Sequence, residues 1–481
     1  MITAPGLERR LHWATLIIGF LRKAPETVLA IPAVLGFLSR SGFPAFLLFA
    51  MIGALFAFGM ALLSWLRFTY RVSSDHLVIE SGVFGRRKRS IPFHHVQDTT
   101  IERPLLARIF GTAVLKLETA SSGKNEAVLD SVSLSEAERI RDLVRLTPCS
   151  DRQAAAAEEP EARPLFRMEL PRLVLAGLFS FSFLFLALVG ALLEVAGPFI
   201  GLDHHRWMMA FRAAADRLGP SSLAGVLGLF LILGILSGVA QTLARDYRFR
   251  LDRTASGLRR RRGLLTVSEV VLSAGRVQVA VIKTGPLRRL LRWFRLELQT
   301  LGSEAGSASQ QVVAPLARVS EIRPILGELG LHLVLPSATH VRVSRDFIIQ
   351  RSTALLAILA VASGGLGFLW PPAFLMVILF PLCMIIPELE WRTQSYFLST
   401  DALHVRKGVF RQRLWLIPLS KVQAVSLSRS LTERAWKLRT LHIDTAGAPR
   451  FGSPSIAGLD KLTADFLASR LIHSSALAAA R

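Results

Sequence analysis

The sequence has little cysteine and none of the common catalytic signatures. Its two cysteines, Cys149 and Cys383, are too few for a disulfide framework or for a metal site of their own. No P-loop, GxSxG, GxGxxG, HExxH, CxxC or protein-kinase motif occurs in its 481 residues. We therefore expect a noncatalytic protein that uses no cofactor and no metal.

Acidic residues are also scarce, at 35 against 58 lysines and arginines, which gives a formal net charge of +23. Yet 51% of the residues are hydrophobic and the mean hydropathy is +0.42, which is too apolar for a set of soluble domains. Part of the chain must lie in lipid, and the basic residues must gather outside the apolar runs.

The apolar residues fall into six runs arranged as three pairs. The runs cover residues 27–38 with 44–66, 171–197 with 222–243, and 347–370 with 372–387. Runs near twenty residues with almost no charge suit the hydrocarbon core of a membrane. We expect three transmembrane helical hairpins, at 25–66, 171–243 and 347–390.

The distribution of positive charge predicts how these hairpins are oriented. The turns between paired helices hold only Arg40, Arg206, Arg212 and Arg217, and every other lysine or arginine lies on the opposite side. By the positive-inside rule, both termini and all segments between hairpins are cytoplasmic in a bacterial inner membrane, with one external loop at 198–220. Residues 1–24 have an apolar centre too short to span, and we expect an amphipathic helix on the membrane surface.

Tyrosine is the rarest signal, and it marks an internal repeat. The three tyrosines each begin a copy of one stretch, with an acid five residues later, then a glycine, then a glutamine and a threonine at fixed spacing. The signature residues are Tyr70, Asp75, Gly82, Gln97 and Thr119; Tyr247, Asp252, Gly263, Gln278 and Thr300; and Tyr396, Asp401, Gly408, Gln423 and Thr445. The second copy has four extra residues before its glycine, which we interpret as an insertion at a hairpin end. Repetition at this length indicates a copied domain.

The three copies define modules at 67–146, 244–330 and 391–473, with the second divergent and with linkers at 147–170 and 331–346. Apolar and polar residues alternate with period two, as in half-buried strands, and each module closes with a helical pattern. The fold class is thus an α+β membrane protein, in which each hairpin alternates with a small antiparallel barrel or sandwich capped by a C-terminal helix.

The order tyrosine, acid, glycine, basic strand, Ile-Pro, Val-Gln and a strand ending in Thr-Ala resembles the bacterial PH-like domain of YdbS- and YdbT-type membrane proteins. Ile91 with Pro92 and Ile417 with Pro418 fit this pattern, whereas Leu272 replaces the isoleucine in the second module. The resemblance covers nearly the whole chain. It implies a seven-stranded PH-like fold with a C-terminal helix, anchored in the cytoplasmic membrane, and it implies little about activity.

Basic residues around the three signature glycines are the candidate lipid- or surface-binding site. Four such residues near an anionic leaflet contribute roughly 4 kcal/mol of salt-sensitive attraction. Specific headgroup binding, general surface adhesion and plain solvated charge all fit this pattern. The residues are Arg86, Arg87, Lys88 and Arg89; Arg259, Arg260, Arg261 and Arg262; and Arg406, Lys407, Arg411 and Arg413.

The remaining features favour structural roles. We expect the signature residues to maintain the fold, with the tyrosines in a membrane-interface belt or a domain core. Adjacent histidines, His94 with His95 and His204 with His205, have diverging side chains and no accompanying carboxylates, so we expect no metal there.

We predict that the modules bind anionic membrane lipids or protein partners, including another membrane protein or a second copy, and not nucleic acid. The protein would then act as a scaffold in envelope homeostasis. The alternative is a transport or export component whose helices form a path gated by the modules. Polar residues of the apolar runs lie near helix ends, which argues against a classical transporter.

Overall fold

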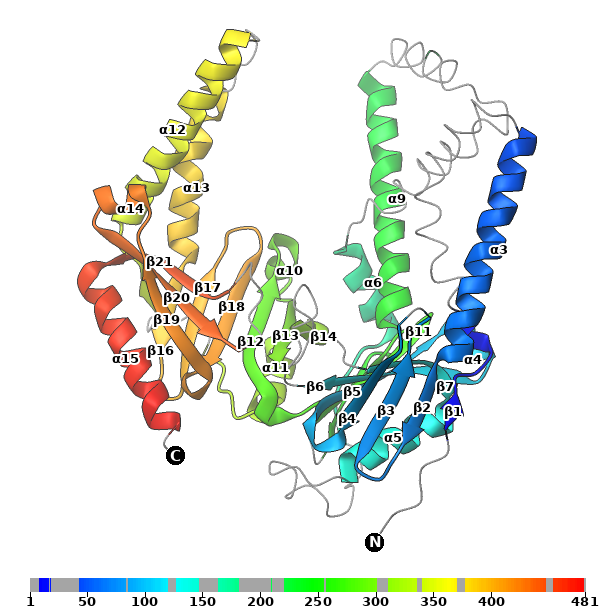
Figure 1. Ribbon diagram of the computed structural model, residues 1–481. Helices are drawn as coiled ribbons and strands as arrows, with labels where there is room; N and C mark the ends of the chain where they lie inside the picture. Colours follow the sequence, from blue (N-terminus) through cyan, green and yellow to red (C-terminus); the bar gives the residue numbers. More distant parts are fainter. Residues whose placement is uncertain are drawn as a thin grey trace. The chain divides into compact units, whose positions relative to one another are not determined.

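The computed structural model describes residues 8–16, 18, 43–83, 85–119, 127–146, 163–180, 209, 220–254, 257–300, 310–334, 340–369, 377–446 and 453–479 (Figure 1). The chain forms two compact units, Met1–Val271 and Leu272–Arg481. The first unit contains module 1 and the first sheet of module 2. The second unit contains the other sheet of module 2 and module 3.

Module 1 is a sandwich of two antiparallel sheets. The first sheet has the order β1-β2-β3-β4, and the strands β5, β6 and β7 belong to the second. Side chains that alternate along both sheets meet in one core with the helix that follows β7, and Leu77, Phe93, Leu115 and Ile140 are fully buried there. The elements are β1 (Arg9–Arg10), β2 (Thr69–Val72), β3 (His76–Ser81), β4 (Arg87–Pro92), β5 (Val96–Pro104), α4 (Leu105–Ile109), β6 (Thr112–Thr119), β7 (Ala127–Ser133) and α5 (Leu134–Leu146).

The same seven strands and closing helix recur in the other two modules. In module 2 they are β8 (Arg163–Arg167), β9 (Arg250–Thr254), β10 (Gly257–Arg262), β11 (Thr266–Leu272), β12 (Val277–Thr284), β13 (Phe294–Thr300), β14 (Gln310–Ala317) and α11 (Val319–Gly327). In module 3 they are β15 (Val341–Arg342), β16 (Ser395–Leu398), β17 (Ala402–Lys407), β18 (Gln412–Pro418), β19 (Val422–Ser428), β20 (Leu438–Thr445), β21 (Ser455–Asp460) and α15 (Lys461–Ala479). Short helices α10 (Pro286–Leu290) and α14 (Leu431–Ala435) occupy the place of α4. The seven strands and helix match what the resemblance implied.

Each module begins before its apolar segment, a feature that the sequence pattern did not predict. β1, β8 and β15 pair with β2, β9 and β16, and the apolar segment of each copy lies between these two strands in the sequence. Residues 147–170 and 331–346 are therefore not plain linkers, because each supplies a strand. Residues 1–24 likewise include a strand, and Leu11 is buried in the core of module 1. Two- to five-residue edge strands with little alternation leave a weak sequence signal.

The modules are joined edge to edge, so none of them is a closed barrel among the described strands. β5 of module 1 pairs with β11 of module 2, and β12 of module 2 pairs with β18 of module 3. Each joint merges two half-modules into one seven-stranded sheet. Modules 1 and 3 meet the expectation of a sandwich, because in each of them both sheets and the closing helix share one core, and the expectation of closure into a barrel is not met.

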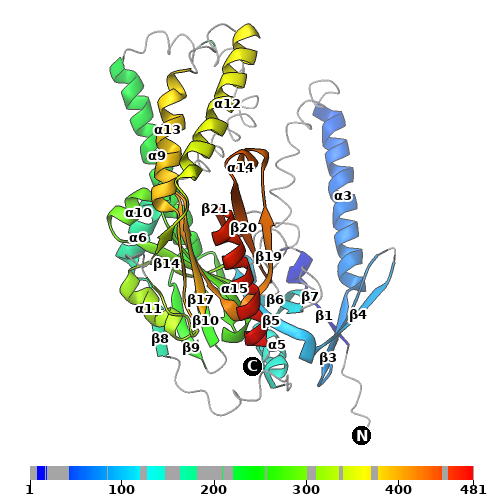
Figure 2. The ribbon, with the colours of Figure 1, turned by 90° about the vertical axis from the view of Figure 1, so that its left-hand side faces the viewer.

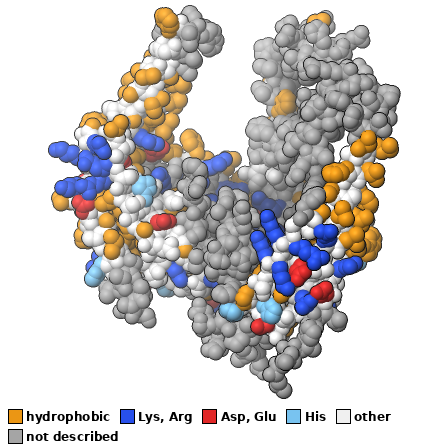
Figure 3. Space-filling model, in the orientation of Figure 1, with side chains coloured by type: hydrophobic (Ala, Val, Ile, Leu, Met, Phe, Trp, Pro, Cys, Tyr) orange, Lys and Arg blue, Asp and Glu red, His pale blue; other side chains and the backbone are white. Residues whose placement is uncertain are grey.

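Long apolar helices emerge from the modules, and Figure 3 shows hydrophobic side chains along those parts of α3 and α12 whose side chains are described. Gly228–Asp246 and Asp346–Gly365 are long and apolar enough to cross a membrane. The helices are α3 (Phe43–Arg67), α6 (Leu170–Leu178), α9 (Pro220–Asp246), α12 (Asp346–Leu369) and α13 (Phe380–Thr393). Several of the expected segments lie outside the described residues. These are the run 27–38, the first five residues of the run 372–387, most of the run 171–197 and nearly all of the loop 198–220.

Candidate anion-binding site

The basic residues singled out by sequence lie in three different environments. Those of module 1 are exposed on β4 and just before it, and Lys88 forms an ion pair with Glu80 at 3.2 Å. Those of module 2 lie on β10, before the glycine turn. In module 3, Arg406 and Lys407 are half-buried at the end of β17.

Burial sets the protonation behaviour of several of these groups. Burial, with Arg262 nearby, lowers the pKa of Arg260 to about 9 even though Asp246 opposes the shift. Burial and Arg289 lower the pKa of Arg406. Arg260 is therefore buried and Arg406 half-buried, so plain solvated charge, one of the three interpretations left open by the sequence, does not describe these two side chains.

The strongest site lies in the first unit, at the end of α9. A cavity of about 650 Å³ opens there, between β8, β9, β10 and the start of α6. Six arginines line it against one glutamate, and apolar side chains complete its wall. The lining residues are Arg108, Arg167, Met168, Glu169, Leu170, Leu173, Tyr247, Arg248, Phe249, Arg250, Arg261, Arg262, Gly263, Leu264 and Val267.

Three of these arginines form a row across three adjacent strands. Arg167 of β8 lies directly opposite Arg250 of β9, and Arg250 lies directly opposite Arg261 of β10. Directly opposed residues share one face of a sheet, and like charges in that position destabilise it. Such a row in a cavity favours an anionic ligand, which would turn three repulsive neighbours into three donors.

The corresponding rows of the other modules are different. Module 1 has Arg10 opposite Thr69 and Thr69 opposite Glu80. In module 3, Ser395 of β16 lies between Arg342 and Arg406. Among the described rows, three consecutive arginines therefore occur only in the module whose sequence diverges.

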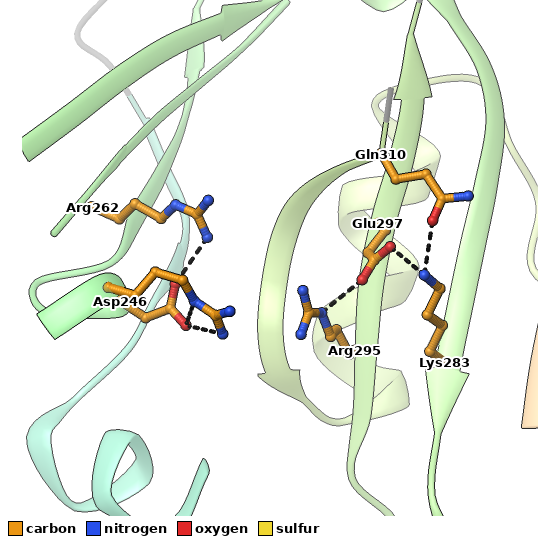
Figure 4. Close-up of polar contacts among 7 residues, drawn as sticks. Asp246, Arg262, Lys283, Arg295, Glu297 and Gln310 are labelled. Carbon is orange, nitrogen blue, oxygen red and sulfur yellow. Dashed lines mark hydrogen bonds and ion pairs between the residues drawn. The ribbon is translucent and has the colours of Figure 1, made fainter. Parts of the chain in front are cut away.

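Carboxylates nearby are already engaged. Asp246, 1% exposed at the end of α9, accepts hydrogen bonds from Arg262 at 2.9 Å and from Arg245 at 3.0 Å (Figure 4). Asp252 accepts a bond from Arg250 at 2.6 Å. Within the described part of the chain, neither Arg167 nor Arg261 has a carboxylate partner.

Backbone geometry fixes the position of the cavity at the end of the apolar helix. The chain leaves α9 through Arg248, whose φ of 50° is a left-handed conformation that a side chain of this type rarely adopts. The amides of Gly263 and Leu264 donate to the carbonyls of Tyr247 and Ala244 at 2.9 and 3.0 Å, which holds the glycine turn against the helix end. The arginine row is thus held next to the end of the candidate membrane span Gly228–Asp246.

The signature glycines and glutamines lie where the backbone has special geometry. Gly82, Gly263 and Gly408 have φ values of 120°, 114° and 104°, and an added Cβ would meet a backbone carbonyl oxygen at 2.3 Å or less. In each module the signature glutamine lies at a β-bulge: Gln97, Gln278 and Gln423 fall between the paired residues where the register shifts.

The signature threonines also hold equivalent places. Thr119, Thr300 and Thr445 pair with the valine that precedes the bulge in each module, and Thr300 and Thr445 are 2% exposed.

The signature tyrosine and acid hold equivalent places in the fold in only two modules. Tyr70 and Tyr396 are 5% and 6% exposed and pair with Ile79 and Val405, so they are core residues. The amides of Phe93 and Leu419 donate to the carbonyls of Asp75 and Asp401, at 2.8 and 2.9 Å.

In module 2 the equivalent pairing involves Leu251 and Arg260, so Tyr247 and Asp252 lie four positions out of register. The inferred four-residue insertion was wrong. Leucine replaces tyrosine in that core, and Tyr247 lines the cavity instead.

Sequence reasoning found Arg261 and Arg262 but missed Arg108, Arg167, Arg248 and Arg250. Arg167 was assigned to a linker because β8 was not recognised. Arg167 and Arg342 each lie shortly before an apolar run, at 171–197 and 347–370, which was the available signal.

A second charged cluster, in the other unit, is structural. Glu297 is 5% exposed, accepts a hydrogen bond from Lys283 at 2.6 Å and forms an ion pair with Arg295 at 2.8 Å, while Lys283 also donates to Gln310 (Figure 4). Module 1 has the same diagonal pair with its charges exchanged, Glu102 with Lys116 at 2.8 Å. No group of three or more possible metal ligands occurs in the described part of the chain.

Comparison with known proteins agrees with this architecture. The model of the Bacterial PH domain family matches residues 26–146, 181–330 and 340–475. The UPF0699 transmembrane protein YdbT of Bacillus subtilis (strain 168) is 22% identical over 408 residues, covering 81% of this chain and 82% of that protein. No solved structure matches. With two candidate spans as well, this is a membrane-associated protein, and the three matches, which together cover more than half of the sequence, show that the chain belongs to the Bacterial PH domain family.

Proposed function

We propose that this protein is a noncatalytic membrane scaffold whose second module binds the phosphate of an anionic phospholipid headgroup. The arginine row of Arg167, Arg250 and Arg261 carries the proposal. Arginine donors match phosphate oxygens in geometry and charge. The cavity also adjoins the end of a candidate span, at the depth where headgroups lie.

Apolar side chains support a lipid over a soluble anion. Leu170 and Leu264 are 57% and 42% exposed beside the arginines, and both line the cavity. Exposed leucines next to a phosphate site suit the glycerol and upper acyl region of a lipid, since that region is apolar. A free phosphate would leave them in water.

The proposal places the modules on the cytoplasmic side of the inner membrane. Support comes from the scarcity of lysine and arginine in the turns between the paired apolar runs. Anionic lipids give the cytoplasmic leaflet its negative surface potential, which matches the net charge of +23.

Lipid titration of the purified full chain tests the site. Short-chain phosphatidylglycerol and phosphatidylcholine are titrated calorimetrically into the protein in a neutral detergent. We expect Arg167→Gln to weaken phosphatidylglycerol binding about fivefold, because one basic group near an anionic headgroup contributes about 1 kcal/mol. Arg167→Gln/Arg261→Gln should weaken it by a further factor of about five.

Arg10→Gln is the matched control, since Arg10 holds the same strand position in module 1 opposite Thr69. Equal affinities for all three variants, or equal binding of both lipids by the wild type, would refute the proposal. Inorganic phosphate in the same titration separates a lipid site from a phosphate site, because a lipid site resists competition by free phosphate.

A further inference from the structure

Two strands have an open edge where their counterparts in the other modules are paired. β5 pairs with β11 and β12 pairs with β18. β19 is the counterpart of β5 and β12 in module 3, and β4 is the counterpart of β11 and β18 in module 1. Among the described strands, β19 pairs only with β20, and β4 pairs only with β3.

The two joints within the chain share one register. Thr100 lies opposite Val270 in the first joint, and Val281 lies opposite Trp415 in the second. Thr100 and Val281 each follow the signature glutamine by three residues, and Val270 and Trp415 each follow the signature glycine by seven. Two independent joints at one register indicate a repeated interface, and the same count assigns Ser426 and Arg89 to a third.

Side-chain exposure marks the open edge as incomplete. Ile101 and Ile282, one residue beyond the counted positions on β5 and β12, are 5% and 6% exposed. Their counterpart on β19, Leu427, is 37% exposed. The neighbouring strand covers this position at both joints, and nothing described covers it on β19.

We propose that β19 pairs antiparallel with β4 of a second copy of this chain, with Ser426 opposite Arg89. The pairing continues the run of joints from module 3 of one copy to module 1 of the next. Such a head-to-tail contact uses two different surfaces, so it builds a ring or a filament according to the rotation per step.

The charges of β4 agree with this register within the two strands. Arg87, Lys88 and Arg89 fall opposite Ser428, Leu427 and Ser426, which carry no charge, and only beyond the strand ends does the same count bring Arg86 opposite Arg429. Lysine and arginine on an exposed edge also deter pairing with other strands. A joint of a few residues is small, but confinement of both copies to one membrane raises their effective concentration.

Cysteine crosslinking in membranes tests the contact. In a background of Cys149→Ser and Cys383→Ser, one tagged chain carries Ser426→Cys and a differently tagged chain carries Arg89→Cys. Directly opposed residues in an antiparallel pair have Cα atoms roughly 4.5–5.5 Å apart, within the range for a disulfide. We expect mild oxidation to give an adduct of two chains that carries both tags, and reduction to remove it.

Leu427→Cys in place of Ser426→Cys is the off-register control, because adjacent residues face opposite sides of a strand. The adduct should fall to background with this control. Equal adducts from both positions, adducts between two copies of Ser426→Cys, or no adduct would overturn the proposal. So would a chain carrying both cysteines that crosslinks only within itself, since the partner strand would then be its own β4.

Discussion

Arg167→Gln should stabilise the protein without anionic lipid, and anionic lipid should cancel or reverse that gain relative to the wild type. Arg167 is exposed, lies directly opposite Arg250, and has no carboxylate partner in the described part of the chain. Removing one of two opposed like charges relieves about 0.2–1 kcal/mol. Arg10→Gln should give no such gain, because Thr69 faces Arg10.

Anionic lipid offsets the gain of Arg167→Gln, because a bound ligand stabilises the folded state more when it binds more tightly. At a concentration of about 100 times Kd, a bound lipid adds about 2.7 kcal/mol to the wild type. A variant that binds the lipid fivefold more weakly gains about 1 kcal/mol less stabilisation from it. This loss equals or exceeds the repulsion that the substitution relieves.

The assay is thermal unfolding of the full chain in neutral detergent, with and without phosphatidylglycerol and at two salt concentrations. The gain of Arg167→Gln in lipid-free detergent should shrink at high salt, because exposed charges are screened. A lower unfolding midpoint for Arg167→Gln under all conditions would refute the reasoning, since the row would then be part of the fold and not a ligand site.

Other substitutions test the structure around the site. Gly408→Ala should cost about 1–3 kcal/mol of unfolding free energy, because φ is 104° and the new Cβ would meet the carbonyl of Arg411 at 2.3 Å. Gly365→Ala, in a helix with open space at that position, is its control and should cost nothing measurable by the same thermal unfolding. Glu297→Gln should cost about 3 kcal/mol by leaving Lys283 and Arg295 without their buried carboxylate, whereas Glu80→Gln, at an exposed pair, should cost under about 1 kcal/mol. Stability should also fall below about pH 6.5, because burial lowers the pKa of His404, whose Nε2 lies 3.1 Å from the carbonyl of His332. The unfolded state then binds more protons than the folded state, and His404→Gln should flatten the pH profile of the unfolding midpoint.

Much of the fold could be predicted because the repeat carries its own register. The spacing from Gly82 to Gln97 and Thr119 recurs without change, and these residues mark a left-handed turn, a bulge and a strand pair in the structure. Conformational requirements of this kind are local, so a sequence can reveal them.

Pairing between modules could not be predicted in the same way. The contact of β5 with β11 depends on residues more than 150 positions apart, and no local pattern indicates which edge pairs with which.

The repeat in module 2 was aligned on the wrong residue, Tyr247, because a rare residue five positions before an acid matched by coincidence. The core position belongs to Leu251, which is equally apolar and gives no distinctive signal.

The position of each apolar segment within its module explains why the arginine row lies where it does. The chain enters the apolar segment of module 2 from the end of β8 and returns through α9 to the start of β9, and these two strands are neighbours. Adjacent strands lie about 4.8 Å apart, so both ends of the segment are held close together at one edge of the sheet. Arg167 and Arg250 are the last and first residues of those strands. Whatever residues occupy these two positions must therefore face the membrane end, and Arg10 with Thr69 and Arg342 with Ser395 hold the same places in the other modules. The topology supplies one such position in each module, and the side chains decide which of them suits an anion.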